Sequence, residues 1–432
     1  MRNWIILLIA FITTQPSWAM QNIQHWLTDN GARVYFVAAP ELDMVDIQLA
    51  FDAGSARDEE KKGLATLTNG LLNEGTQGLS ADQIAEQFSS LGAKYSNSVD
   101  RDMSVVGLRS LIDENLLQPA VELLATLVAK PTFDDVAFER VRQQMLVNLQ
   151  LEQQTPSKIA SKHFYNLVYG THPYASRAEG EAEIIQRMTP VDTQDFHQRY
   201  YVAKNLVIAM VGNLNGKQAK HIAEQLSAKL PGGEKAPPLP EVEPLTQENV
   251  SHISFPSEQT HVLIGQPGMK RGDPDYFTLY VGNYILGGSG FASRILSEIR
   301  EKRGLAYSAY SYFLPFKELG PFLAGLQTRG DQTDTAITVL KQTLNQFITE
   351  GPTSEELERA KKGITGNFPL KIKSNKNIIS YVAMIGFYSL PLDYLTQFNQ
   401  QIEAVTIEKI KDAFQRRVKL DKLVTVTVGS NN

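Results

Sequence analysis

The chain repeats one pattern: residues 107–145 read GLRSLIDENLLQPAVELLATLVAKPTFDDVAFERVRQQM, and residues 325–364 read GLQTRGDQTDTAITVLKQTLNQFITEGPTSEELERAKKGI. In both stretches, a strand that ends in Gly-Leu leads through a polar turn into an amphipathic helix. A Pro-Thr turn with acidic capping residues then starts another helix. The copies lie about 220 residues apart, which indicates a duplicated domain rather than a solenoid of short repeats.

The ends of the two copies match as well. Residues 191–214, VDTQDFHQRYYVAKNLVIAMVGNL, parallel residues 405–430, VTIEKIKDAFQRRVKLDKLVTVTVGS, each a helix followed by a β-branched strand that closes on Gly. Alternating segments such as residues 33–40 and 45–51 are typical of half-buried strands. Clusters of strands and runs of helices predict an α+β architecture, with helices packed on one face of each sheet.

A Pro-rich stretch divides the two halves. Residues 230–245, LPGGEKAPPLPEVEPL, are unsuited to a helix or a central strand and are typical of an exposed linker. We therefore predict two domains of ordinary size, residues 20–229 and residues 251–432, joined by a linker at residues 230–250.

The composition limits the classes of function. Hydrophobic residues make up 42% of the chain and charged residues 21%, as in soluble globular proteins. A net charge of −5 provides no overall basic surface, which argues against a nucleic-acid partner. The sequence contains no cysteine, so disulfides, thiolate zinc sites and cysteine nucleophiles are excluded.

The first residues resemble a secretory leader. Arg2 precedes an apolar run, WIILLIAF, that is too short to span a bilayer. Ser17 and Ala19 supply small residues three back and one back from a cut after Ala19. We predict a signal peptide at residues 1–19 rather than a membrane anchor, and a periplasmic or secreted mature chain. A buried N-terminal strand is the alternative, and a lipid anchor is not expected because no cysteine follows the cut.

One stretch of the first half resembles a known family. Residues 52–76, DAGSARDEEKKGLATLTNGLLNEGT, resemble the opening of the inverzincin peptidases, the pitrilysin/insulinase or M16 family. The resemblance is closest to the short-chain, M16B-like branch, and it covers nearly the whole mature chain. It implies a duplicated M16/LuxS-like metallohydrolase fold, with a mostly antiparallel sheet covered by helices in each domain. It also implies that one chain forms half of a clamshell.

The resemblance fails where the family holds its metal. Family members carry H-x-x-E-H on this helix, in which two His bind zinc and the Glu polarises its water. Here the His positions fall on Thr66 and Gly70, and the Glu position falls on Asn69. The third ligand of the family, a Glu on a later helix, aligns best near Asn148. Neutral amides and hydroxyls are weak zinc ligands, so we expect no metal and no cofactor in this chain.

No shift of the alignment restores the motif. The sequence contains no histidine between His25 and His163, so a displaced H-x-x-E-H is impossible in this region. An unorthodox metal site built from carboxylates is the remaining alternative.

The second half retains its signature. Residues 286–311, LGGSGFASRILSEIREKRGLAYSAYS, match the second-half string of the family, including an Arg and a Tyr seven residues later, here Arg300 and Tyr307. Their implied role is to bind the substrate carbonyl and stabilise the oxyanion beside the zinc of the other domain or chain. A solvated helix charge and a core aromatic are the alternatives.

Two further segments are candidates for substrate binding. The Gly-rich turn formed by Gly287, Gly288, Ser289 and Gly290 allows close approach of a peptide, or serves as a structural turn only. A second set, Ser96, Asn97 and Ser98, aligns with the edge strand that pairs with extended substrates in the family; ordinary sheet structure is the alternative. The string His172-Pro173-Tyr174 also occurs in the family, where it resembles a loop packing motif.

Together these features imply a subunit without zinc. The chain is similar to the alpha-type partner of processing peptidases, in which one subunit keeps the zinc motif and the other has lost it. It would supply Arg300, Tyr307 and half of a peptide chamber to a zinc-bearing homologue, or associate with itself. The alternative is an inert scaffold or peptide-binding protein of the same fold, like the core subunits of the respiratory bc1 complex.

Overall fold

Two sheets form the framework of the computed structural model, which describes residues 22–430. The predicted signal peptide lies outside the described residues. The first sheet has six strands in the order β1-β2-β8-β3-β7-β6, and only its β2–β8 pair is parallel. Its strands are β1 (Gln24–Leu27), β2 (Arg33–Ala38), β3 (Met44–Phe51), β6 (Lys94–Val99), β7 (Ser104–Leu111) and β8 (Leu206–Gly212).

The second sheet has five strands in the order β11-β12-β10-β13-β9, and only its β13–β9 pair is parallel. Its strands are β9 (Asn249–Ser254), β10 (Gln259–Met269), β11 (Ala306–Phe313), β12 (Gly320–Arg329) and β13 (Val424–Gly429). A short hairpin of β4 (Gly75–Thr76) and β5 (Leu79–Ser80) follows the first helix. The duplicated α+β fold is thus confirmed, with a mixed, mostly antiparallel sheet in each half.

Helices cover both sheets. In the first half they are α1 (Leu64–Leu71), α2 (Ala81–Ser90), α3 (Glu114–Ala129), α4 (Asp135–Glu152), α5 (Pro156–Tyr169), α6 (Ala182–Ile185), α7 (Pro190–Tyr200) and α8 (Gly216–Ala228). In the second half they are α9 (Tyr276–Asn283), α10 (Arg294–Leu296), α11 (Thr333–Glu350), α12 (Ser354–Lys371), α13 (Asn375–Phe387), α14 (Tyr394–Glu403) and α15 (Ile407–Arg417). Within the described residues, no helix combines the length and the apolar character needed to cross a bilayer.

The repeated Pro-Thr turns start helices as the sequence predicts. Asp134 caps α4, because its carboxylate accepts hydrogen bonds from the backbone N–H groups of Val136 and Ala137. In the second copy, Thr353 and Glu356 form a capping box at the start of α12. Between the halves, residues 231–248 contain no helix or strand.

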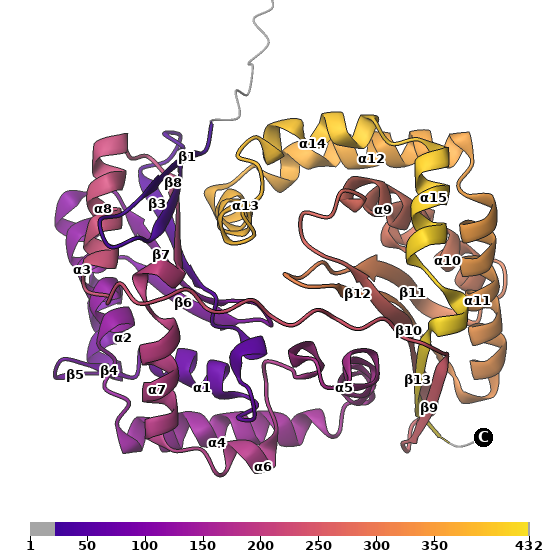
Figure 1. The fold of residues 1–432 in the computed structure, drawn as a ribbon, viewed down its shortest axis with the longest axis horizontal. Coiled ribbons are helices and arrows are strands. Elements are labelled where there is room, and N and C mark those ends of the chain that lie inside the picture. Colours follow the sequence, from indigo (N-terminus) through magenta and orange to yellow (C-terminus); the bar gives the residue numbers. More distant parts are fainter. Residues whose placement is uncertain (1–21, 431–432) are drawn as a thin grey trace, which may run out of the picture.

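The halves exchange one helix each. Helix α5, from the first half, packs on β10 and β13, whereas α13, from the second half, packs on β2, β3 and β8. Glycines permit both contacts: a Cβ atom on Gly265 would lie 2.9 Å from Phe164 Cζ of α5, and one on Gly386 of α13 would lie 2.6 Å from Tyr35 Cδ2. Figure 1 shows α13 beside β8 and α5 on the side of the second sheet that faces the first half.

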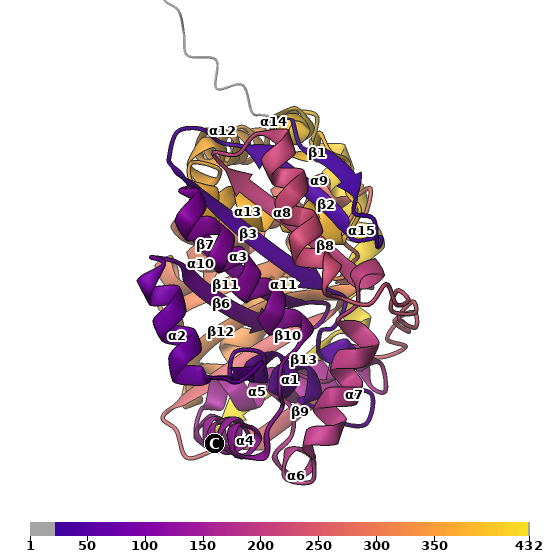
Figure 2. The same ribbon diagram turned by 90° about the vertical axis from the view of Figure 1, so that its left-hand side faces the viewer.

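This exchange buries the first sheet on both faces. Figure 2 shows α3 and α8 across its outer face, where Phe36 and Leu49 belong to the core of the first half. On the inner face, Tyr35 and Ala50 belong instead to the cluster that includes Val382 of α13. Packing of helices on one face alone was therefore an incomplete prediction, because α13 arrives from a distant part of the chain.

A buried carboxylate holds the two halves together at their seam. Asp102 is 2% exposed. The hydroxyl of Tyr174 donates a hydrogen bond to its Oδ1 (2.5 Å), and the hydroxyl of Tyr388, from α13's C-terminal end, donates to its Oδ2 (2.8 Å). The backbone N–H of Lys317 also donates to Oδ2 (2.7 Å). Burial raises the pKa of Asp102 above its usual value, and burial together with the Asp102 charge raises the pKa of both tyrosines, which therefore remain donors at neutral pH.

The loop that carries Tyr174 packs into the same seam. Tyr174 is fully buried, and its backbone N–H donates to Nδ1 of His172 at 3.0 Å. The other ring nitrogen, Nε2, then carries the proton and donates to the carbonyl of Pro240 at 2.9 Å. His172 thus joins the loop to the segment that links the halves, which is a packing role.

Candidate functional site

Helix α1, which aligns with the metal-binding helix of the family, starts at a buried carboxylate. Both carboxylate oxygens of Asp58 accept backbone hydrogen bonds, from Gly63 (2.7 Å) and Ala65 (2.8 Å). Gly63 has a φ of 103°, which a side chain would disfavour. Burial raises the pKa of Asp58 to about 7. The start of the helix is therefore fixed by contacts that involve none of the candidate metal positions.

On α1, the polar side chains at the metal positions are bonded inside the protein. The hydroxyl of Thr66 donates to the carbonyl of Ala178 at 2.5 Å. Asn69 is only 3% exposed, and its Nδ2 donates at 2.7 Å to the hydroxyl of Ser104. That hydroxyl shares a second hydrogen bond, of 2.6 Å, with the hydroxyl of Tyr201. Asn69 therefore joins α1 to β7 and cannot position a water as a catalytic Glu would.

The other two metal positions offer no charged or imidazole group either. A Cβ atom on Gly70 would lie 3.3 Å from Val141 Cγ1 of α4, so a larger side chain there would have to displace α4 side chains. Asn148 is exposed on α4, and its Oδ1 accepts a hydrogen bond from Gln144 at 3.1 Å. Between residues 22 and 430, no cluster of three or more His, Cys, Asp or Glu residues is arranged to hold a metal. The residues present therefore do not fit zinc.

The candidate edge strand lies next to α1. Strand β6 is at one end of the first sheet, and exposure alternates along it, with Ser96 and Ser98 exposed and Asn97 half-buried. Nδ2 of Asn97 donates to the backbone carbonyl of Asn69 at 2.9 Å, which ties the strand to α1. An exposed edge of this kind is able to accept an added strand.

In the second half, Arg300 and Tyr307 lie against each other. Arg300 belongs to a π-helical turn, Ser297–Glu301, and its Cζ is 4.4 Å from the centre of the Tyr307 ring and 4.9 Å from that of Phe291. Tyr307 is 80% exposed and Phe291 is 67% exposed. Within the described part of the chain, no hydrogen bond or ion pair engages the side chain of Arg300; only its backbone carbonyl accepts a hydrogen bond, from the N–H of Gly304 at 2.9 Å. A guanidinium that lies against two rings, with its donors unused, is available to bind an oxygen of a ligand.

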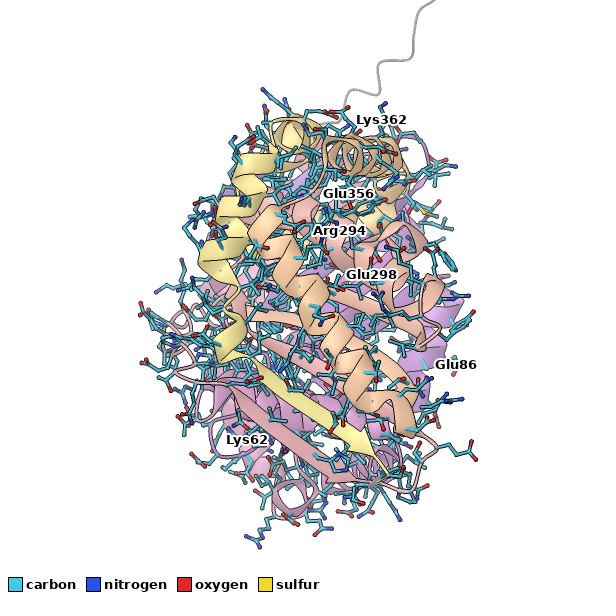
Figure 3. All side chains as sticks on the ribbon, turned by 90° about the vertical axis from the view of Figure 1, so that its right-hand side faces the viewer. Lys62, Glu86, Arg294, Glu298, Glu356 and Lys362 are labelled. Atoms are coloured by element: carbon cyan, nitrogen blue, oxygen red, sulfur yellow. The ribbon has the colours of Figure 1, made fainter. Side chains whose placement is uncertain are left out.

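Partly buried contacts position the segment that carries Arg300. Arg294 forms two hydrogen bonds of 2.6 Å with the carboxylate of Glu356 and a third of 3.0 Å with the carbonyl of Gly351. Figure 3 shows Arg294 and Glu356 close together on the outer side of the second half. This pair joins α10 to α12 and restrains the turn that follows α10.

The Gly-rich turn divides into packed and exposed parts. Gly287 is buried, and a Cβ atom there would lie 2.4 Å from the backbone nitrogen of Ser311 on β11. Gly288 and Gly290 are exposed and Ser289 is half-buried; Gly290 has a φ of 62°. Gly287 is thus required for packing, whereas the rest of the turn is accessible beside Phe291.

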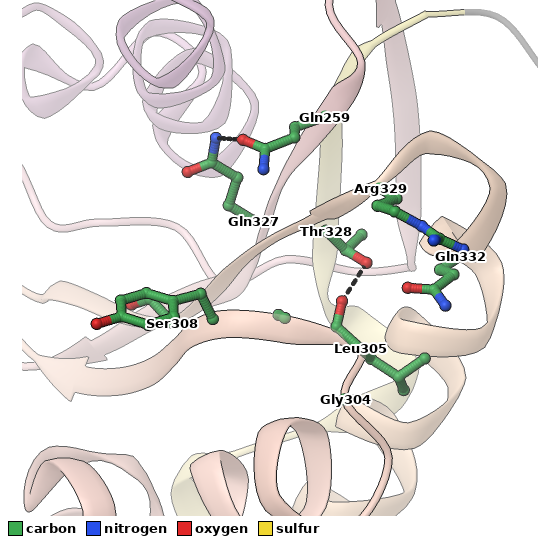
Figure 4. Close-up of a pocket in the computed structure, with 10 residues that line it drawn as sticks. Gln259, Gly304, Leu305, Ser308, Gln327, Thr328, Arg329 and Gln332 are labelled. Atoms are coloured by element: carbon green, nitrogen blue, oxygen red, sulfur yellow. Dashed lines mark hydrogen bonds between the residues drawn. The ribbon is translucent and has the colours of Figure 1, made fainter.

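A shallow cavity lies beside Tyr307. Its volume is about 260 Å³, and its lining includes Tyr307, Ser308, Gln259, Gln327 and Arg329. Figure 4 shows the side chains of Gln259 and Gln327 facing each other, joined by a hydrogen bond, on the side away from Leu305. A volume below the usual 300–1,000 Å³ of small-molecule sites indicates room for a side chain rather than for a cofactor.

Comparisons with known proteins assign the family. The model described as Insulinase (Peptidase family M16) matches residues 33–181, and the model described as Peptidase M16 inactive domain matches residues 187–364. A crystal structure of a peptidase M16 inactive domain from Pseudomonas fluorescens is 40% identical and has a TM-score of 0.92. The match covers 95% of this chain and 98% of that one. The chain belongs to peptidase family M16.

Among other M16-type relatives, some are named as proteases and one as a non-peptidase. A Helicobacter pylori protein named Non-peptidase homolog YmxG is 28% identical over 396 residues, 90% of each chain. A Bacillus subtilis protein named Uncharacterized zinc protease YmxG is 24% identical over 416 residues, 95% of this chain and 99% of that one. The crystal structure of a protease from Helicobacter pylori, 19% identical with a TM-score of 0.87 over 94% of this chain and 99% of that one, shares the M16 fold. Membership of the family and the presence of two M16 domains are confirmed.

Sequence reasoning missed two features of this M16 chain. Phe291, the second ring against Arg300, lies inside the quoted second-half string but has no periodicity that marks it. Asp102 follows a strand and precedes another, where an acidic residue is typical of an exposed turn. Its partners, Tyr174, Lys317 and Tyr388, are too distant in sequence for any local pattern to reveal the contact.

Proposed function

We propose that this chain is the non-zinc subunit of a periplasmic, heterodimeric M16-type peptidase. The observation that carries the proposal is the contrast between the halves: α1 has no side chain suited to zinc, yet Arg300 and Tyr307 are stacked and accessible. In the assembly, a zinc-bearing homologue would close over this chain as the other half of a clamshell. The accessible pair would then stabilise the oxyanion of a peptide bound at the partner.

A second function, an inert scaffold or peptide-binding protein, is favoured by a different observation. Asn69, at the position of the catalytic Glu, belongs to a buried chain of hydrogen bonds with Ser104 and Tyr201. In addition, one relative carries the name Non-peptidase homolog. A scaffold needs neither Arg300 nor Tyr307, so the effect of replacing them in an assembled complex separates the two functions.

Purified alone, the chain should bind no stoichiometric zinc. Thr66, Asn69, Gly70 and Asn148 offer no charged or imidazole ligand, and the first two are already hydrogen-bonded. Metal analysis after dialysis against trace zinc measures this, with a homologue that carries H-x-x-E-H as the positive control. One tightly held zinc per chain, lost on mutation within residues 66–70, would contradict the non-zinc assignment.

The chain should associate more tightly with a zinc-bearing M16 homologue than with itself. Exposed aromatic residues beside Arg300 form a patch of the kind that usually has a partner. Co-expression followed by size-exclusion chromatography measures the association. A chain that remains a monomer in the presence of a homologue encoded beside it would refute the heterodimer.

A further inference from the structure

Exposed large apolar side chains gather on and beside β11. Tyr307, Tyr310, Tyr312 and the neighbouring Phe291 and Leu314 are each between 37% and 80% exposed. Single exposed apolar residues are ordinary, whereas a contiguous group marks a surface that binds something. We call Tyr307, Tyr310 and Tyr312 the tyrosine strip.

The face on which Tyr310 and Tyr312 lie follows from the strand pairing, whereas Tyr307 falls within a register shift between Ala306 and Ala309. Tyr310 pairs with Gly325 and Tyr312 pairs with Leu323 in the β11–β12 ladder, and directly paired residues point to the same face of a sheet. Leu323 belongs to the core cluster that includes Phe164 of α5. The two tyrosines therefore lie on the face that α5 covers, but on the outermost strand, where they are partly exposed.

The outer edge of β11 is closed to an added strand. Nδ2 of Asn283 donates to the backbone carbonyl of Ser311 at 2.9 Å, and the hydroxyl of Ser311 donates back to Asn283 Oδ1 at 2.7 Å. Gly287 packs directly against the Ser311 backbone. A ligand at β11 must therefore bind to the face through side chains, unlike a strand that pairs with the free edge of β6.

The duplication shows that the strand ladder forms without tyrosine at these positions, although the Tyr310 ring packs on Gly325 in this half. In the first half, the residue that pairs with the equivalent glycine, Gly107, is Ser96, and the residue at the next position on the same face is Ser98. They correspond to Tyr310 and Tyr312 of the second half. The same ladder is thus built with serine in one copy and tyrosine in the other. Pairing of the strands therefore does not explain why the second half has tyrosine at these two positions.

The geometry of the strip matches an extended peptide. The ring centres of Tyr310 and Tyr312 are 5.9 Å apart and their planes are within 3°. Alternate side chains of an extended chain are about 6.6–6.8 Å apart, so two of them can each lie on one ring. At the other end of the strip, Arg300 lies on the Tyr307 ring with no carboxylate against it in the described chain. A ligand with a carboxylate at that end would supply the missing charge.

We propose that the tyrosine strip binds an extended peptide segment with apolar side chains at alternate positions and an acidic side chain toward Arg300. Tyr307 and Phe291 are highly exposed at this end, so a chain can continue past Arg300, which favours an internal Asp or Glu over a C-terminal carboxylate. The inference rests on the proposed function, since it names the peptide class that the same wall would accept. Tyr310 and Tyr312 are then specificity-determining residues.

Fluorescence anisotropy with the full mature chain and capped, labelled peptides tests the inference. The probes are acetyl-Glu-Ser-Phe-Ser-Phe-amide and the reversed sequence, because the strip does not fix the direction of the chain. Replacement of both residues by those of the first copy, Tyr310→Ser with Tyr312→Ser, should weaken binding of the better probe roughly 10–30-fold. The matched pair Tyr310→Phe with Tyr312→Phe keeps the rings and should retain wild-type affinity. A probe with Gln in place of Glu should bind more weakly, and that difference should shrink at high salt.

Several outcomes would overturn the inference: equal affinity of the serine and wild-type chains, equal affinity of the Glu and Gln probes, or no binding of either probe. If the serine pair unfolds, Tyr310→Leu with Tyr312→Leu keeps apolar packing on β12 while removing the ring faces, and a loss of affinity is again expected. The assay involves neither cleavage nor a zinc-bearing partner. Peptide binding can therefore succeed where the proposed peptidase complex proves inactive, and fail where it proves active.

Discussion

Replacement of Arg300 by Ala, or of Tyr307 by Phe, should lower kcat of the assembled peptidase by roughly 10²–10³, the usual effect of removing one donor to an oxyanion. The guanidinium lies on the Tyr307 ring with its N–H groups unused, and the tyrosine is exposed, so both groups are accessible to a substrate oxygen. The effect should appear in kcat more than in KM, because the hydrogen bond strengthens as charge develops in the transition state.

A neighbouring arginine provides the matched control. Arg303 lies on the same segment, but its guanidinium is occupied by the carboxylate and backbone carbonyl of Glu298. Arg303→Ala removes the same charge from a surface ion pair of small energetic value, and it should leave kcat unchanged. Zinc content of the complex and the affinity between subunits should be unchanged in all three variants. Full activity of both the Arg300 and Tyr307 variants would establish the scaffold function instead.

The sequence predicts the strands and helices of this M16 chain, but not which sheet α5 and α13 pack on. Residues 33–40 and 45–51 alternate, and they form β2 (Arg33–Ala38) and β3 (Met44–Phe51). Period two specifies that successive residues face opposite sides, but not what lies on either side. Likewise, the amphipathic patterns of α5 and α13 require a buried face without naming the sheet that buries it. That choice depends on Gly265 and Gly386, whose lack of a side chain lets each helix approach the other half's sheet.

In the candidate site, too, the sequence indicates the residues but not their contacts. The proximity of Arg300 and Tyr307 was expected only from resemblance, because a π-helical turn and the following strand have no common period that would bring them together. The structure adds Phe291 as a second ring against the guanidinium. Neutral residues at the metal positions were visible in the sequence, but the hydrogen bond from Asn69 to Ser104 was not. A buried polar chain requires partners from several segments, and only the folded chain supplies them.

Replacement of Asp102 by Ala should lower the free energy of unfolding by about 3–5 kcal/mol, the usual cost of removing one partner from a buried charged network. Two tyrosine hydroxyls and the N–H of Lys317 would lose an acceptor that is only 2% exposed. Since Tyr388 and Lys317 come from the second half, the loss should also loosen the halves. Cleavage within residues 231–248 by a nonspecific protease should then accelerate, and urea denaturation followed by tryptophan fluorescence gives the stability itself.

The loss of stability caused by Asp102→Ala should depend on pH in one direction. Because burial raises the pKa of Asp102, its contribution to stability is complete below the pKa of the unfolded chain and declines as the pH rises through the folded value. The difference between wild type and Asp102→Ala should therefore be greatest at acidic pH. Glu59→Ala is the control, since it breaks an exposed ion pair with Arg199 (side chains 65% and 55% exposed) and should cost less than about 1 kcal/mol. Equal urea midpoints for the two variants would mean that Asp102 does not hold the halves together, and that the exchanged helices α5 and α13 suffice.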